Sequence, residues 1–83
     1  MNHFIPETEL RDRLLRENAE YRKLAAEHQS YSEQLEFLTN KHFLSEEEQL
    51  KEKMLKKKKL MLKDRMYAMV QKARKESDPE QEV

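Results

Sequence analysis

Apolar residues recur along the first half of the chain at alternating spacings of four and three residues. Seven of the nine positions in this series are apolar or aromatic. Such a repeat is typical of a helix that packs along a single seam, as in a coiled coil. It predicts one helix over residues 7–39, which no proline interrupts. The seam positions are Leu10, Leu14, Glu17, Tyr21, Leu24, His28, Tyr31, Leu35 and Leu38.

The repeat stops at a turn over residues 40–45. Because the chain has no glycine, Asn40 is the best candidate for a left-handed residue at the helix end. Ser45 and Glu48 have the spacing of a capping box, in which each side chain binds the other residue's backbone N–H. A second helix is therefore predicted over residues 46–75. Its apolar stripe consists of Leu55, Leu62, Met66, Met69 and Ala73, with Leu50, Met54 and Met61 beside it.

Two long amphipathic helices joined by a short link predict an all-α, antiparallel two-helix hairpin that resembles a coiled coil. With the turn centred near residues 42–43, Leu35 is expected opposite Leu50, and Leu24 opposite Met61. The hairpin is a single domain over residues 1–75, and residues 76–83 are expected to form a flexible acidic tail. Apolar side chains off the seam favour the pairing of two hairpins into a four-helix bundle.

The composition excludes several classes of function. The 83 residues include no glycine and no cysteine, so glycine-rich phosphate loops, disulfides, thiolate metal sites and cysteine nucleophiles are ruled out. A hairpin two helices thick is expected to have no cleft, so neither an enzyme nor a small-molecule substrate is predicted. No catalytic residue, metal site or cofactor is assigned. No apolar run reaches the roughly 18 residues of a membrane span, and a cytoplasmic protein is expected.

The charge is balanced overall and strongly uneven along the chain. There are 17 basic and 17 acidic residues, yet residues 51–75 hold 11 basic residues against only Glu52 and Asp64. Such a basic face could bind the phosphates of a nucleic acid, an anionic membrane surface or an acidic protein partner. The simpler interpretation is a solvated face whose lysines pair with Glu27, Glu33 and Glu36 of the other helix. The candidate basic face consists of Lys53, Lys56, Lys57, Lys59, Lys63, Arg74 and Lys75.

Three polar residues fall on or near the predicted seam. Tyr21 is expected near Asp64, and a hydrogen bond between them would set the register of the two helices. His28 lies in the seam between Leu24 and Tyr31. It is predicted to be a half-buried, hydrogen-bonded histidine, with a pH-dependent switch and a metal or catalytic role as alternatives.

The chain resembles the YdcH-like family of small bacterial helical-hairpin proteins of uncharacterised function. The matching stretches are residues 17–24 (ENAEYRKL), His28 with Leu35, and residues 55–69 (LKKKKLMLKDRMYAM). The last stretch is similar to the family's ending LKKxKLxLKDxIYxML. It departs from that ending at Arg65 and Met66, where the family often has an acid and a β-branched residue. The resemblance implies an all-α hairpin that tends to self-associate, and it implies no established activity.

These observations predict a non-enzymatic helical interaction module. Its expected partner is a second copy of the chain or another protein. The alternative is a nucleic-acid accessory protein that binds phosphates through the basic second helix.

Overall fold

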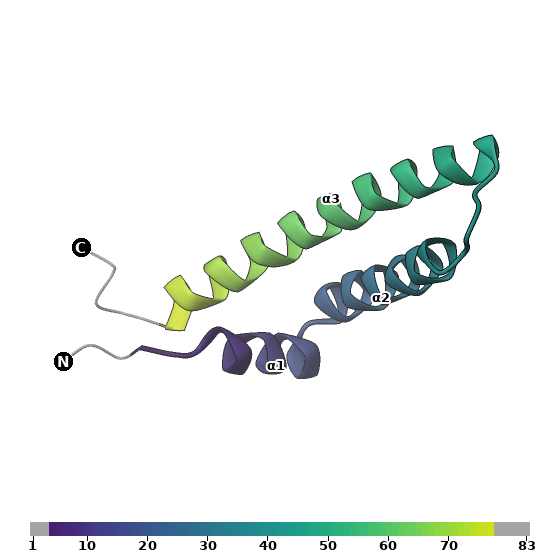
Figure 1. Ribbon diagram of the computed structural model, residues 1–83. Coiled ribbons are helices and arrows are strands. Elements are labelled where there is room, and N and C mark those ends of the chain that lie inside the picture. Colours follow the sequence, from purple (N-terminus) through teal and green to yellow (C-terminus); the bar gives the residue numbers. More distant parts are fainter. Residues whose placement is uncertain (1–3, 78–83) are drawn as a thin grey trace.

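The computed structural model describes residues 4–77, which form three helices and no strand. Helix α1 spans Glu7–Glu17, α2 spans Ala19–Thr39 and α3 spans Glu46–Ser77. Figure 1 shows α1 and α2 end to end, running antiparallel to the long α3. The molecule measures 55 × 23 × 18 Å, so it is one long helix in length and about two helix diameters across. The prediction of an all-α fold is confirmed.

The prediction of one helix over residues 7–39 is wrong, because the chain breaks at Asn18. Its backbone is extended, with φ −118° and ψ 110°. The Asn18 side chain accepts a hydrogen bond from the Tyr21 N–H at 2.9 Å, and the Asn18 N–H donates to the Leu14 carbonyl at 2.8 Å. Asn18 therefore ends α1 and caps α2. A straight helix would hold Glu17 in the apolar seam, whereas the break leaves Glu17 exposed.

The turn between α2 and α3 confirms one prediction and corrects another. Asn40 is right-handed, with φ −80° and ψ −6°, and no non-glycine residue in the described range has a positive φ. The left-handed Asn40 was therefore a wrong prediction. The capping box is confirmed: the Ser45 N–H donates to the Glu48 carboxylate at 3.0 Å, and the Glu48 N–H donates to the Ser45 hydroxyl at 3.1 Å. Helix α3 begins at residue 46 as predicted and continues to Ser77, two residues further than predicted. The remaining tail residues lie outside the described range.

The capping box should make the stability of the hairpin fall as the solution becomes acidic. The Lys41 ammonium and the Ser45 backbone N–H lower the pKa of Glu48 to about 2 from its usual 4.5. A carboxyl group with a lowered pKa in the folded state stabilises the fold above pH 4.5, and this contribution is lost as the pH falls towards 2.

We therefore expect the melting temperature of the parent chain to fall more steeply between pH 5 and pH 2 than that of Glu48→Gln. Circular dichroism melts over this pH range give the comparison. Parallel pH curves for the two chains would contradict the prediction.

The core consists of two clusters, one shared by all three helices and one between α2 and α3. One contains Leu10, Tyr21 and Val70, and the other contains Leu35, Leu38 and Leu55. Among the described residues, every buried side chain is hydrophobic. The buried residues are Leu10, Tyr21, Leu24, Leu35, Leu38, Leu55, Leu62 and Val70.

The register differs from the predicted one by about five residues along α3. Leu35 packs with Leu55 instead of lying opposite Leu50, and Tyr21 packs with Val70. Residues 43–45 are not helical, and Figure 1 shows that α3 starts beyond the end of α2. The shift leaves Leu50, Met54 and Met61 exposed, although all three had been placed beside the seam.

Candidate functional site

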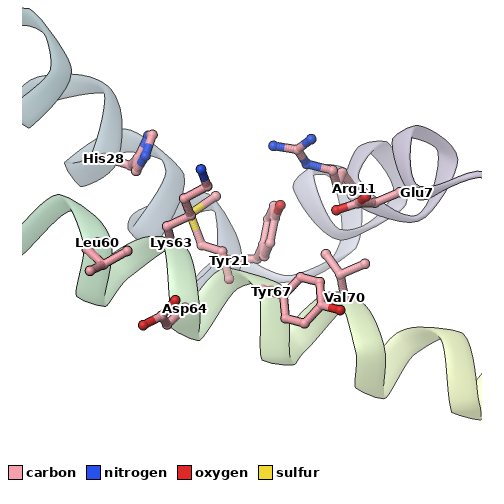
Figure 2. Close-up of a pocket in the computed structure, with 10 residues that line it drawn as sticks. Glu7, Arg11, Tyr21, His28, Leu60, Lys63, Asp64, Tyr67 and Val70 are labelled. Atoms are coloured by element: carbon pink, nitrogen blue, oxygen red, sulfur yellow. The ribbon is translucent and has the colours of Figure 1, made fainter.

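A groove of about 370 Å³ lies where the three helices meet, beside the break at Asn18. Helix α1 contributes Glu7 and Arg11, and α2 contributes Tyr21 and His28 (Figure 2). The α3 wall consists of Leu60, Lys63, Asp64, Met66, Tyr67 and Val70. The volume is within the range of small-molecule sites, at its lower end. The expectation that this fold has no cleft is therefore wrong, and the reason is that α1 and α2 do not form one straight helix.

All three predicted polar seam residues line this groove, but only Tyr21 and His28 have their polar atoms on the same side. Tyr21 is buried and His28 is half-buried, while Asp64 is exposed. In Figure 2, the Asp64 carboxylate points away from the Tyr21 hydroxyl and the His28 ring. No hydrogen bond joins Tyr21 to Asp64 among the residues described.

His28 lies in a positive environment. Partial burial lowers its pKa below the usual 6.5, and the nearby charges of Lys59, Lys63 and Arg11 lower it further. Both effects disfavour the imidazolium and favour the neutral imidazole. A neutral imidazole can donate one hydrogen bond and accept another.

The predicted basic face does not lie on one surface as a uniform set. Lys53, Lys56, Lys57, Lys63 and Lys75 are exposed, whereas Lys59 and Arg74 are half-buried. The Arg74 guanidinium donates to the Ile5 carbonyl at 2.8 Å and lies over the Phe4 ring, so this residue holds the open ends of α1 and α3 together.

Few of the basic residues on α3 pair with acids. Lys56 lies 3.8 Å from Glu52 of the same helix, and Arg65 lies 3.3 Å from Glu20 of α2. The expected pairing of the lysine run with Glu27, Glu33 and Glu36 does not occur in the part of the chain that the structure describes. Most of the positive charge of residues 56–59 therefore faces solvent.

Large apolar side chains are exposed on two different sides of α3. Leu50, Met54 and Met61, at spacings of four and seven residues, share one side, while Leu60 and Tyr67 share another. In the described range, nine large hydrophobic residues are exposed and eight hydrophobic residues are buried. The exposed residues are Phe4, Leu15, Phe37, Phe43, Leu50, Met54, Leu60, Met61 and Tyr67.

Residues 22–70 match the model of a family described as a protein of unknown function (DUF465). The chain belongs to this family. The match covers more than half of the chain, and the resemblance to YdcH-like proteins stated above is consistent with it. Comparisons with curated proteins and with solved structures find no match for this DUF465 chain. Arg11 and Tyr21 lie outside the matched residues, so the family match does not extend to the whole groove.

Two kinds of feature are absent from residues 4–77. None of the three helices is both long enough and apolar enough to cross a membrane. No group of three or more His, Asp or Glu side chains in this range is arranged to hold a metal ion.

Sequence reasoning missed Arg11, Leu60 and Tyr67 as neighbours of His28. Their proximity depends on the break at Asn18 and on the shifted register of α3. The available signal was Glu17, a charged residue at a seam position, followed directly by a residue type that often caps helices. These two residues together favour a break over a continuous helix.

Proposed function

We propose that this protein is a non-enzymatic helical interaction module that pairs with a second copy of itself. The observation that carries the proposal is the excess of exposed over buried large apolar side chains among residues 4–77. A lone hairpin with so small a core is marginally stable, and covering a second apolar surface would add to its stability. The proposal retains the cytoplasmic location expected from the sequence.

The surface that we assign to this pairing is the stripe of Leu50, Met54 and Met61 on α3. Beside Met61, a groove of about 230 Å³ extends to Tyr31 and Glu27 of α2. Methionine side chains are flexible and adapt well to the surface of a partner helix. Two hairpins that cover each other's stripes would form the four-helix bundle expected from the sequence.

Charge favours one arrangement of the two copies. Helix α3 holds 11 basic and six acidic residues, so two α3 helices would repel each other. Helix α2 holds four acidic and two basic residues. The α3 of one copy is therefore expected to pack against the α2 of the other, which gives a symmetric pair with two equivalent contacts.

Met61→Glu should prevent this pairing while leaving the hairpin folded. Met61 and its neighbour Leu60 are both 58% exposed but point to different sides of α3. Leu60→Glu is therefore a matched control for the added charge. We expect the parent chain and Leu60→Glu to have masses above 10.2 kDa by light scattering, and Met61→Glu to have the mass of one chain.

Helicity by circular dichroism separates loss of pairing from loss of folding. A parent chain with the mass of a monomer at all concentrations would contradict the proposed function. If the parent chain is a dimer that Leu60→Glu disrupts and Met61→Glu does not, the chain self-associates, but not through the stripe of Leu50, Met54 and Met61.

A nucleic-acid accessory function is the second candidate. The observation in its favour is that the run of Lys56, Lys57, Lys58 and Lys59 is largely unpaired within the described residues. Phosphate contacts release counterions, so binding would fall steeply with salt.

Replacing these four lysines by glutamine should abolish any binding of duplex DNA or RNA, measured by fluorescence anisotropy at two salt concentrations. The log–log salt dependence should lessen by about 0.9 for each lysine that contacts a phosphate of DNA. Undiminished binding by the folded glutamine variant would exclude this function for the lysine run.

A further inference from the structure

The groove at the helix break gathers four hydrogen-bond donors from three helices. They are the Arg11 guanidinium of α1, the Tyr21 hydroxyl and the His28 ring of α2, and the Lys63 ammonium of α3. Figure 2 shows these polar groups along one side of the groove. Residues 11, 21 and 63 come from three different helices, so the site exists only in the folded chain.

None of these four side chains has a hydrogen-bond or ion-pair partner within residues 4–77. In contrast, the side chains of Arg13, Arg22, Arg65 and Arg74 all donate to protein oxygens. The groove donors are thus available to a ligand that offers several acceptors.

The charges nearest His28 are positive, whereas the groove lining as a whole holds two acids and two bases. The imidazole of His28 faces Arg11 from α1 and Lys59 and Lys63 from α3, which disfavour a further positive charge there. Glu7 and Asp64 are the acids of the groove lining. Asp64 points away from the donors in Figure 2, and neither acid forms an ion pair with Arg11 or Lys63 in the described range.

The apolar part of the lining comes from α3, where Asp64 lies between Leu60 and Tyr67. The exposed side chains of Leu60 and Tyr67 lie along α3 beside the groove, and Met66 and Val70 complete this wall. A ligand that fits the whole groove would therefore combine an anionic group with an apolar or aromatic body.

We propose that this groove binds a small phosphate ester, with its phosphate held by Arg11, His28 and Lys63 and its apolar body against Leu60 and Tyr67. A phosphate monoester offers three strong acceptor oxygens and nearly two negative charges, which matches donors that converge from three helices. A carboxylate offers two oxygens and one charge. The groove and the stripe of Leu50, Met54 and Met61 lie on different sides of α3, so this proposal does not depend on self-association.

The test uses phenyl phosphate as the probe, titrated into the 83-residue chain and followed by NMR at the His28 ring. Inorganic phosphate and phenol are titrated separately, because each represents one half of the probe. Phenyl phosphate should bind more tightly than either. The bound anion should also raise the pKa of His28, since it offsets the charges of Arg11, Lys59 and Lys63.

Two substitutions locate the binding site. Arg11→Gln and Lys63→Gln should each weaken phenyl phosphate binding about tenfold, the effect of losing one charge-assisted hydrogen bond. Arg16→Gln and Lys53→Gln are the matched controls, because both residues are exposed on the same two helices and lie outside the groove lining. The controls should change the affinity less than twofold, and circular dichroism verifies that all variants are folded.

Several results would overturn the proposal. Equal weakening by Arg11→Gln and Arg16→Gln would mean that the probe is attracted by general surface charge only. A His28 ring unaffected by phenyl phosphate would mean that no anion occupies the groove. Equal affinities for phenol and phenyl phosphate would show that the phosphate makes no contribution.

Discussion

Leu62→Asp should unfold the hairpin at room temperature. Leu62 is 7% exposed on α3, at the interface with α2. Replacing a buried leucine even by alanine costs about 2–5 kcal/mol, and a buried unpaired carboxylate costs more. A core of eight side chains in an 83-residue chain supplies a net stability of only several kcal/mol. The helical circular dichroism signal should therefore be largely lost.

Leu60→Asp is the matched control, two residues away on the same helix and 58% exposed. It adds the same charge among the same lysines, so the general electrostatic effect of the aspartate is equal in the two variants. We expect Leu60→Asp to retain parent helicity and to unfold in urea with a midpoint close to that of the parent. A folded Leu62→Asp variant would show that the α2–α3 contact is not the core of the molecule. If both variants are unfolded, the difference in exposure between Leu60 and Leu62 does not determine the effect of the aspartate.

The three neighbouring residues 60–62 of α3 face three different surroundings, which are fixed by how α3 packs against α2. Leu60 lies on the groove side, Met61 on the proposed pairing side and Leu62 in the core. Successive residues of an α-helix are about 100° apart, so each points in a different direction. Periodicity in the sequence identified Leu62 correctly as a core residue. Periodicity alone could not assign Leu60 and Met61 to separate surfaces, because this assignment requires knowing where α2 lies relative to α3.

Local signals predicted the parts of the fold that depend on a few neighbouring residues. The capping box at Ser45 and Glu48 was correct because both hydrogen bonds close within one helical turn. The helix boundaries near residues 7, 39 and 46 were also correct. The seam of the first half was largely correct, since Leu10, Tyr21, Leu24, Leu35 and Leu38 are buried.

The register and the groove could not be predicted, because both depend on contacts between distant residues. A symmetric turn was assumed, whereas α3 is displaced by about five residues relative to that arrangement. The seam itself contained the evidence against a straight helix at Glu17. Once α1 and α2 separate at Asn18, Arg11 and His28 come to line the same groove. The candidate site thus results from a break that the heptad pattern indicates only through the charged residue at Glu17.

Tyr21→Ala should destabilise the hairpin by about 3–5 kcal/mol, the cost of removing a large aromatic side chain from a core. Tyr21 is 2% exposed, and its cluster joins Leu10 of α1 to Val70 of α3. Because this cluster holds the short α1 against α3, the first effect should be the detachment of α1. Urea unfolding gives the change in stability, and hydrogen exchange of the α1 amides should increase more than that of the α2 and α3 amides.

Tyr21→Phe separates the two explanations for this residue. The sequence predicted that Tyr21 sets the register through a hydrogen bond to Asp64, whereas in the described structure the packed ring joins the helices and the two residues are not hydrogen-bonded. If packing dominates, Tyr21→Phe and Asp64→Asn should each change the unfolding free energy by less than about 1 kcal/mol, and their effects should add. If the double mutant loses less unfolding free energy than the two single mutants together, the predicted interaction between Tyr21 and Asp64 exists after all. Independent small effects beside a large effect of Tyr21→Ala would assign the role of Tyr21 to its ring, and would leave its hydroxyl available to the groove.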